Sequence, residues 1–111
     1  AFGMLSGKYL NGQMPEGSRL KLFGNHFPRY QGTRTQLAVE EYHKVSQKHN
    51  LSLAQMSLAF VNAQPFVTSN IIGATTMEQL KENIESINLD LSDDVIEEIN
   101  AIHENNPSPA P

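Results

Sequence analysis

The chain has 111 residues, with 12 acidic and 8 basic side chains and a formal net charge of −4. This length suits one domain with a modest hydrophobic core, and the absence of cysteine excludes a disulfide framework and thiolate metal sites. No apolar run approaches the roughly 20 residues that a membrane-spanning helix needs, so we expect a cytoplasmic protein without a membrane segment.

The amino-terminal third is basic, although the chain as a whole is acidic. Residues 1–34 hold five basic side chains and one acidic, whereas residues 35–111 hold three basic and eleven acidic. A basic stretch rich in Gly and Pro is either a solvated loop or a loop that embraces phosphate, and the acidic remainder would repel a nucleic acid. The chain starts at Ala1 with no initiator Met and no signal-peptide arrangement, so we expect a piece of something longer.

Residues 10–32 predict a long loop. Turn signals at Asn11-Gly12 and Pro15-Glu16-Gly17, and further Gly and Pro residues, interrupt any periodicity. Loops of about 20 residues without regular structure are uncommon in compact domains unless they act as lids or binding loops. We therefore expect this segment to contribute to a binding site.

Four helices are predicted in the rest of the chain, because apolar residues recur there at helical spacing behind a hydroxyl residue. The predicted capping residues, each directly before its helix, are Thr33, Ser52, Thr76 and Ser92, and Gln36, Gln55 and Gln79 complete a capping box in the first three helices. Asn50 is expected to end the first helix in a left-handed conformation, and the second helix has so little polar face that most of its sides should be buried. The predicted inner faces are Ala38, Tyr42 and Val45 in the first helix, Met77, Leu80, Ile84 and Ile87 in the third, and Val95, Ile96, Ile99 and Ile102 in the fourth.

Residues 66–72 carry the only convincing strand signal, although residues 1–4 could contribute the end of another strand. A lone strand leaves its backbone donors and acceptors unpaired, so its neighbours must lie upstream or in another copy of the chain. A buried helix, a strand and a second helix in this order are typical of a parallel α/β architecture. Residues 106–111, which hold three prolines, should form a loose tail.

The segment from Ser69 to Thr76 has the layout of a phosphate or nucleotide seat. The predicted strand stops at Gly73, turns through Thr75 and Thr76, and opens a helix. The first N–H groups of a helix have no intrahelical partner and attract anions, and Gly73 allows close approach of the backbone. Binding residues in parallel α/β folds lie at the carboxyl ends of strands, where this segment is expected.

Two motifs together resemble the C-terminal part of an aldo-keto reductase. They are AFGMLSGKY at residues 1–9 and IIGATTMEQLKENI at residues 71–84. The resemblance is to the bacterial Tas-like branch, which is similar to the potassium-channel β-subunit and aflatoxin-aldehyde-reductase group, and it covers the chain nearly end to end. It implies the C-terminal fragment of a (β/α)8 TIM barrel, from the end of strand 7 through strand 8 and the closing helices, with residues 1–111 forming the C-terminal part of that oxidoreductase domain. It also implies an enzyme that binds NADPH in an extended pose and reduces aldehydes or ketones.

The resemblance implies cofactor-binding residues in both motifs and between them. The first group is Ala1, Phe2, Gly3 and Leu5, which would approach the cofactor by backbone or apolar contact. The second group is Lys8, which would meet the pyrophosphate region, and Arg19, which would reach the adenosine phosphate. The third group is Gly73 and Thr75, which would face the 2′-phosphate, and Gln79, Glu82 and Asn83, which would surround the adenine and its ribose. Many reductases place a Lys-Ser pair and an Arg around the 2′-phosphate, so the preference for NADPH over NADH rests heavily on Arg19 in this chain.

The catalytic Asp, Tyr, Lys and His of such reductases would lie upstream, so no catalytic residue is assigned in this chain. Lys8 beside Tyr9 is better explained by packing, and the four histidines have no zinc-binding spacing. The expected partners are a small-molecule carbonyl substrate and the upstream part of the same barrel, with no metal, nucleic acid or membrane. Two alternatives stay open: a non-catalytic nucleotide-binding regulatory protein resembling the channel β-subunits, and a free-standing α/β module that pairs its strand across a dimer.

Overall fold

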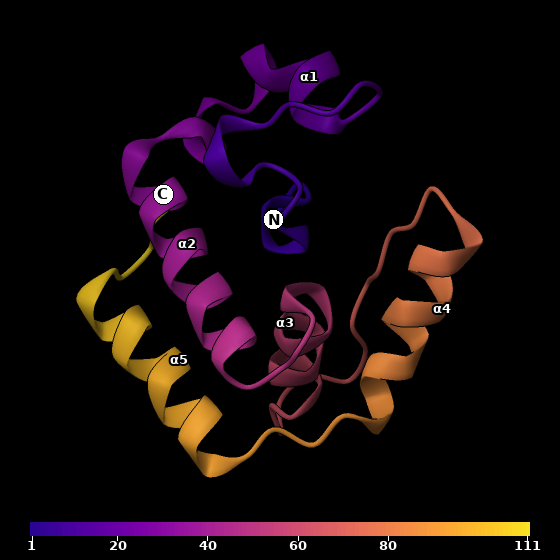
Figure 1. Ribbon diagram of the computed structural model, residues 1–111, viewed down its shortest axis with the longest axis vertical. Helices are drawn as coiled ribbons and strands as arrows, with labels where there is room; N and C mark the ends of the chain where they lie inside the picture. Colours follow the sequence, from indigo (N-terminus) through magenta and orange to yellow (C-terminus); the bar gives the residue numbers. More distant parts are fainter.

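The computed structural model describes residues 1–111 as a set of helices without a strand. The α-helices are α1 (Arg19–Phe23), α2 (Thr33–Lys48), α3 (Leu53–Asn62), α4 (Met77–Glu85) and α5 (Asp93–Asn105). The 3-10 helices are η1 (Met4–Ser6), η2 (Leu10–Gly12), η3 (Gly24–His26), η4 (Pro28–Gln31) and η5 (Ser86–Asn88). Helix α3 packs against both α2 and α4, and α5 lies along the other side of α2 (Figure 1). None of these helices is both long and apolar enough to cross a membrane.

Three of the four predicted helix starts are confirmed. Ser52, Thr76 and Ser92 precede α3, α4 and α5, and the side-chain oxygen of each accepts a hydrogen bond from the amide three residues on, at 3.4, 3.2 and 3.4 Å. Each bond satisfies one of the amides that a helix leaves unpaired in its first turn. Local side-chain chemistry therefore fixes where these helices begin.

Helix α2 begins one residue earlier than predicted. Gly32 occupies the capping position, and its carbonyl accepts from the amide of Gln36 at 3.1 Å, so Thr33 is already helical and makes no cap. The prediction of a capping box at Thr33 is wrong, because the extended backbone at Gly32 (φ −67°, ψ 149°) already provides the entry into the helix. The predicted end is confirmed, since Asn50 has a left-handed φ of +54°.

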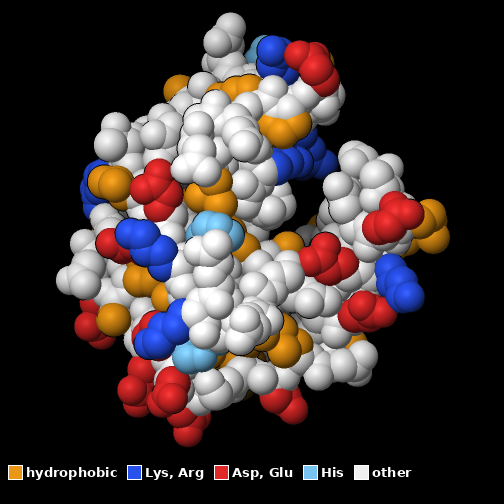
Figure 2. Space-filling view, viewed as in Figure 1, with side chains coloured by type: hydrophobic (Ala, Val, Ile, Leu, Met, Phe, Trp, Pro, Cys, Tyr) orange, Lys and Arg blue, Asp and Glu red, His pale blue; other side chains and the backbone are white.

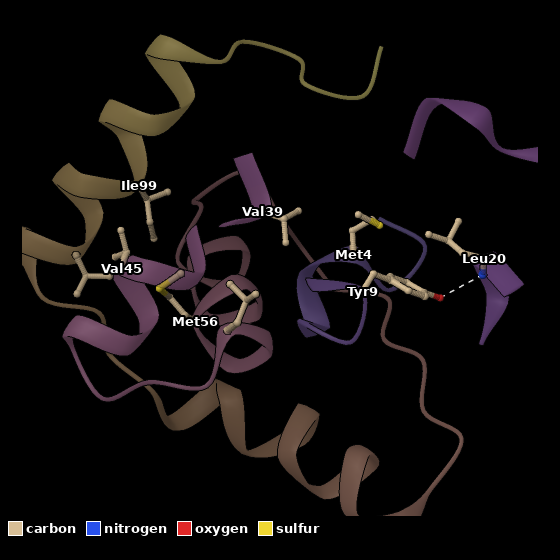
Figure 3. Close-up of a cluster of buried hydrophobic side chains, with 9 residues drawn as sticks. Met4, Tyr9, Leu20, Val39, Val45, Met56 and Ile99 are labelled. Atoms are coloured by element: carbon tan, nitrogen blue, oxygen red, sulfur yellow. Dashed lines mark hydrogen bonds between the residues drawn. The ribbon is translucent and has the colours of Figure 1, made fainter. Parts of the chain in front are cut away.

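The core lies where α2, α3 and α5 meet the amino-terminal segment (Figure 3). Its nine buried side chains are Met4, Tyr9, Leu20, Val39, Val45, Leu53, Met56, Val95 and Ile99. The predicted inner faces of α2 and α5 contribute to it, and no residue from Leu53 to Phe60 of α3 is exposed. Only 15 of the 111 residues are buried in total, so this core covers a small part of the chain's apolar surface.

The amino-terminal segment is less irregular than predicted. The expected loop over residues 10–32 contains helix α1 and three short 3-10 helices. Leu20 anchors it, since this side chain is only 5% exposed and its amide donates to the buried Tyr9 hydroxyl at 3.2 Å. The predicted turn at Pro15-Glu16-Gly17 lies outside the helices, whereas Asn11-Gly12, Gly24 and Pro28 lie within the short 3-10 helices.

The predicted strand at residues 66–72 is not a strand in this structure, and residues 1–4 lead into η1 and form no strand either. The side chains of Phe66 and Ile71 are 81% and 96% exposed. A β-strand is held by hydrogen bonds to a neighbouring strand, and no other segment of the chain offers one. The α/β character expected from the sequence is therefore absent from these 111 residues taken alone.

The predicted inner face of α4 is exposed, which corrects the sequence interpretation. Met77, Ile84 and Ile87 are 74%, 57% and 67% exposed, and Leu80 is only half-buried. The periodicity correctly marks one apolar face, although α4 also packs on α3. The chain itself has no surface that covers this apolar face.

The carboxyl-terminal residues lie against α2. The Arg34 guanidinium donates to the Pro107 carbonyl at 3.2 Å, and the buried Thr35 hydroxyl donates to the Pro109 carbonyl at 2.7 Å. These two bonds tie the Pro-rich segment to the start of α2. Whether the tail moves freely in solution stays a prediction.

Candidate functional site

A cleft of about 410 Å³ lies between the amino-terminal segment and the start of α4. Figure 2 shows it as a hollow with basic side chains on its wall. Residues from three separate stretches line it: 1–8, 15–19 and 71–79. The fold thus brings the basic amino-terminal third against the loop that leads into α4.

Most of the residues expected from the family resemblance lie in this cleft. Those that line it are Ala1, Phe2, Gly3, Lys8, Arg19, Gly73, Thr75 and Gln79. Leu5 and Asn83 line an adjacent hollow of about 290 Å³, which shares Ala1, Gly3 and Gly73 with the cleft. Glu82 lines neither, because its carboxylate accepts from the Ser52 hydroxyl and its backbone carbonyl accepts from the side-chain amide of Gln55.

Arg19 reaches across the cleft. A Cβ built on Gly73 would lie 3.9 Å from Arg19 Nη2, so the guanidinium stands at contact distance from the loop before α4. Arg19 also lies over the Phe2 ring, with 5.6 Å from Cζ to the ring centroid. No carboxylate forms an ion pair with it. Its five donors are therefore available for an anion in the cleft.

Lys8 is the second cation of the cleft without a carboxylate partner. Its side chain lies against the backbone of Gly3, where an added Cβ would come within 2.8 Å of Lys8 Cε and 3.0 Å of Nζ. Gly3 also has a φ of +88°, a conformation that side chains with a Cβ rarely adopt. The glycine therefore lets Lys8 lie across the first turn and extend into the cleft.

The start of α4 already pairs several of its own amides. The amide of Gln79 donates to Thr76 Oγ1, and the amide of Thr75 donates to Gln79 Oε1 at 2.9 Å. Hydrogen bonding to its own amide and to the Thr76 hydroxyl holds the pKa of the Glu78 carboxyl below its usual range. An anion in the cleft would therefore depend on Arg19 and Lys8 more than on the first turn of the helix.

Two amide side chains of α4 shape the loop in front of it. Gln79 Oε1 accepts from both the amide and the hydroxyl of Thr75, at 2.9 and 3.0 Å, and Asn83 donates to the Gly73 carbonyl at 3.1 Å. The loop is thereby fixed to the helix, and Gly73 and Thr75 line the cleft opposite Arg19.

Sequence reasoning missed several cleft residues that adjoin Arg19. Glu16, Gly17 and Ser18 line the wall together with Pro15. The Glu16 carboxylate is held by Lys21 at 3.2 Å, and Ser18 is only 6% exposed. These residues directly precede Arg19, the expected phosphate-binding arginine, and this position in the sequence could have predicted that they line the cleft.

Tyr9 lies in the hydrophobic core, and Tyr42 packs against it. Tyr9 is 7% exposed and accepts a hydrogen bond from Leu20, with Lys8 Nζ 5.3 Å from its ring centroid, so it is a core residue. Burial and the neighbouring Glu41 carboxylate raise the pKa of Tyr42. No three His, Asp or Glu side chains stand close enough together to hold a metal ion.

Comparison with known proteins identifies the family. The model of the aldo/keto reductase family matches residues 1–104. The chain therefore belongs to the aldo-keto reductase family, as the two motifs predicted. This family implies a TIM barrel fold.

Curated relatives agree with this membership. The chain is 56% identical over 110 residues to "Protein tas" of Escherichia coli (strain K12), a match that covers 99% of the chain and 32% of that protein. It is 36% identical over 95 residues to "L-glyceraldehyde 3-phosphate reductase" of Escherichia coli O157:H7, covering 79% of the chain and 26% of that protein. It is 32% identical over 111 residues to "Probable voltage-gated potassium channel subunit beta" of Oryza sativa subsp. japonica, covering 96% of the chain and 34% of that protein. The chain thus spans about a third of the length of the relatives it matches.

Proposed function

We propose that this chain is the C-terminal cofactor-binding portion of an NADP(H)-dependent aldo-keto reductase. The complete protein would transfer hydride between NADPH and the carbonyl carbon of an aldehyde or ketone. The observation that carries the proposal is the cleft, in which two cations without a carboxylate partner, Arg19 and Lys8, face the loop before α4. Membership of the family and the likeness to a reductase support the reaction class.

The residues of the cleft fit a phosphorylated dinucleotide. Its phosphates carry negative charge, and a guanidinium matches phosphate oxygens with two parallel hydrogen bonds. Gly3 and Gly73 have no side chain of their own, so Lys8 lies directly against Gly3 and Arg19 approaches Gly73, and both cations stand in the cleft. The cleft thus combines two cations with glycine backbone from two separate segments.

Each part of the chain would have a separate task in binding. Arg19 would hold the adenosine 2′-phosphate against Gly73 and Thr75, and Lys8 would neutralise the pyrophosphate. Gln79 and Asn83 would act mainly by fixing the loop, because their side chains already bond to it. Bound NADPH supplies the hydride, and this portion of the protein supplies its affinity and orientation.

The first prediction concerns cofactor preference. Replacing Arg19 in the full-length protein by alanine should weaken NADPH binding about tenfold or more, because a charged hydrogen bond contributes roughly 1.5–3 kcal/mol. NADH lacks the 2′-phosphate, so its affinity should change by less than about threefold, within the range of a small indirect effect. Titration of each dinucleotide by fluorescence or calorimetry measures both affinities.

Arg29→Ala is the matched control, since Arg29 stacks on Tyr30 at 4.8 Å and lies outside the cleft. It should leave both affinities unchanged. Equal losses of NADPH and NADH in the Arg19 variant would remove this residue from the 2′-phosphate. A wild-type protein that binds neither dinucleotide would overturn the proposed function as a whole.

A second candidate is a nucleotide-binding regulatory protein without catalysis. The likeness to a protein named as a channel β-subunit favours it. The two candidates differ in turnover, because only the reductase should consume NADPH when aldehydes or ketones are added. Tight NADPH binding without loss of reduced cofactor across a broad panel of carbonyl compounds would favour the regulatory protein.

A further inference from the structure

Ser18 presents a buried hydroxyl without a partner in the wall of the cleft. The residue is 6% exposed, and its Oγ is shielded from solvent and makes no hydrogen bond. Although Ser18 directly precedes α1, its side chain does not cap that helix. Local structure therefore does not account for this hydroxyl.

The other buried hydroxyls of the chain are all satisfied. Ser46 donates to the His43 carbonyl at 2.8 Å, Ser86 donates to the Asn83 carbonyl at 2.6 Å, and Thr35 donates to the tail. Burying a polar group without a hydrogen bond costs free energy, so such groups are rare in folded proteins and call for an explanation. Ser18 is the exception, and it is the one that lies in the cleft.

The surroundings of Ser18 indicate an anionic partner. It stands beside Arg19 and Gly17, and both neighbours also line the cleft. Nothing lies within 4 Å of the position that a Cβ on Gly17 would take, so the space next to Ser18 is open. A serine hydroxyl moves between staggered rotamers by rotation about the Cα–Cβ bond, which would turn Oγ from the wall toward a ligand.

We propose that the Ser18 hydroxyl is a further ligand-binding group of the cleft, which donates a hydrogen bond to a phosphate oxygen of the bound dinucleotide. The inference rests on the proposed function, because it needs a phosphorylated ligand in the same cleft as Arg19. It adds a neutral donor to the two cations. The oxygen belongs either to the 2′-phosphate or to the pyrophosphate, and the comparison of two dinucleotides distinguishes them.

The test is Ser18→Ala in the full-length protein, with two measurements. Affinity for NADPH should fall about tenfold, as expected for a hydrogen bond to a charged group. The melting temperature of the ligand-free variant should stay the same or rise by about 1–3 °C, because an unsatisfied hydroxyl has been removed. Loss for NADPH alone assigns the bond to the 2′-phosphate, whereas equal loss for NADPH and NADH assigns it to the pyrophosphate.

Ser46→Ala is the matched control, since Ser46 is 1% exposed but its hydroxyl is bonded and lies outside the cleft. This variant should lower the melting temperature and leave both affinities unchanged. The proposal is overturned if Ser18→Ala binds both dinucleotides like the wild type, whatever its melting temperature. That result leaves the proposed function intact, because the wild type would still bind NADPH and depend on Arg19.

Discussion

Glu16 is the one carboxylate that lines the cleft beside the two cations. Its side chain is 89% exposed and is held at 3.2 Å by Lys21, which is itself 47% exposed. Exposed ion pairs contribute little to stability, but the bond keeps this carboxylate on Lys21 and leaves Arg19 without an acidic partner. The negative charge of Glu16 should therefore repel the phosphates of the proposed ligand, while its side chain does not fill the binding site.

Removing that charge should strengthen binding. Glu16→Gln is expected to raise NADPH affinity about twofold to threefold at low ionic strength, and less at high salt, because exposed charges are screened. Titrations at two salt concentrations measure the effect. Glu104→Gln makes the same charge change on α5, outside the cleft, and should leave the affinity as it is. If the NADPH affinity of the Glu16→Gln variant is unchanged at low salt, the charge of Glu16 does not act on the bound cofactor.

Helices α2 and α5 are joined at one end by a charged contact. Glu98 of α5 accepts hydrogen bonds from Lys48 Nζ at 2.8 Å and from His49 Nε2 at 2.9 Å. These bonds from Lys48 and His49 hold the pKa of the Glu98 carboxyl below its usual range. The Glu98 contact joins α2 and α5, which also contribute Val45 and Ile99 to the core, so the contact lies at the edge of the core.

This contact predicts a dependence of stability on pH. Since the pKa of Glu98 is lower in the folded protein, its stabilisation is complete above the unfolded value of about 4.3 and is lost as pH falls through the folded value. Glu98→Gln should therefore be slightly less stable than the wild type at pH 7, and the difference should shrink on acidification below about pH 4.3. Thermal unfolding over that pH range measures it. Glu97→Gln, at an exposed neighbour without an ion pair, is the control. A difference that grows on acidification would contradict the assignment.

The molecule as a whole leaves much apolar surface uncovered. Much of it lies between residues 66 and 87, where the side chains of Phe66 and Ile71 and the apolar face of α4 are exposed. In a family whose fold is a TIM barrel, strands cover such helix faces. We infer that the part of the barrel outside this chain packs on α4, which agrees with a chain that spans about a third of its relatives.

Substitution of one residue on this face tests that inference. Ile84→Ser should destabilise the full-length protein by about 2 kcal/mol or more, as loss of a buried aliphatic side chain does. Leu37→Ser is the control, because Leu37 is similarly exposed (51% against 57%) but lies among the polar residues Arg34, Glu40 and Glu41 on α2. It should change the unfolding free energy by less than about 0.5 kcal/mol. Equal small effects in urea unfolding would mean that α4 keeps its apolar face in solvent.

The candidate site could be predicted only in part from the sequence. The family resemblance predicted Arg19, Lys8 and Gly73 as binding residues, and the three line one cleft. The resemblance did not reveal that the Glu82 carboxylate accepts a hydrogen bond from the Ser52 hydroxyl, or that the Ser18 hydroxyl has no partner. Both facts depend on contacts between segments far apart in the chain, which residue type and spacing do not encode.

Local interactions decided the helix starts at Ser52, Thr76 and Ser92 and the left-handed residue at Asn50, because each depends on a few neighbouring residues and their hydrogen bonds. The same local patterns could not decide whether residues 66–72 form a strand or whether the apolar face of α4 is buried. A strand needs a neighbour for its backbone, and an apolar face needs a covering surface, so both depend on what packs nearby in space. The cleft itself arises in the same way, since only folding brings the basic amino-terminal third against the loop before α4.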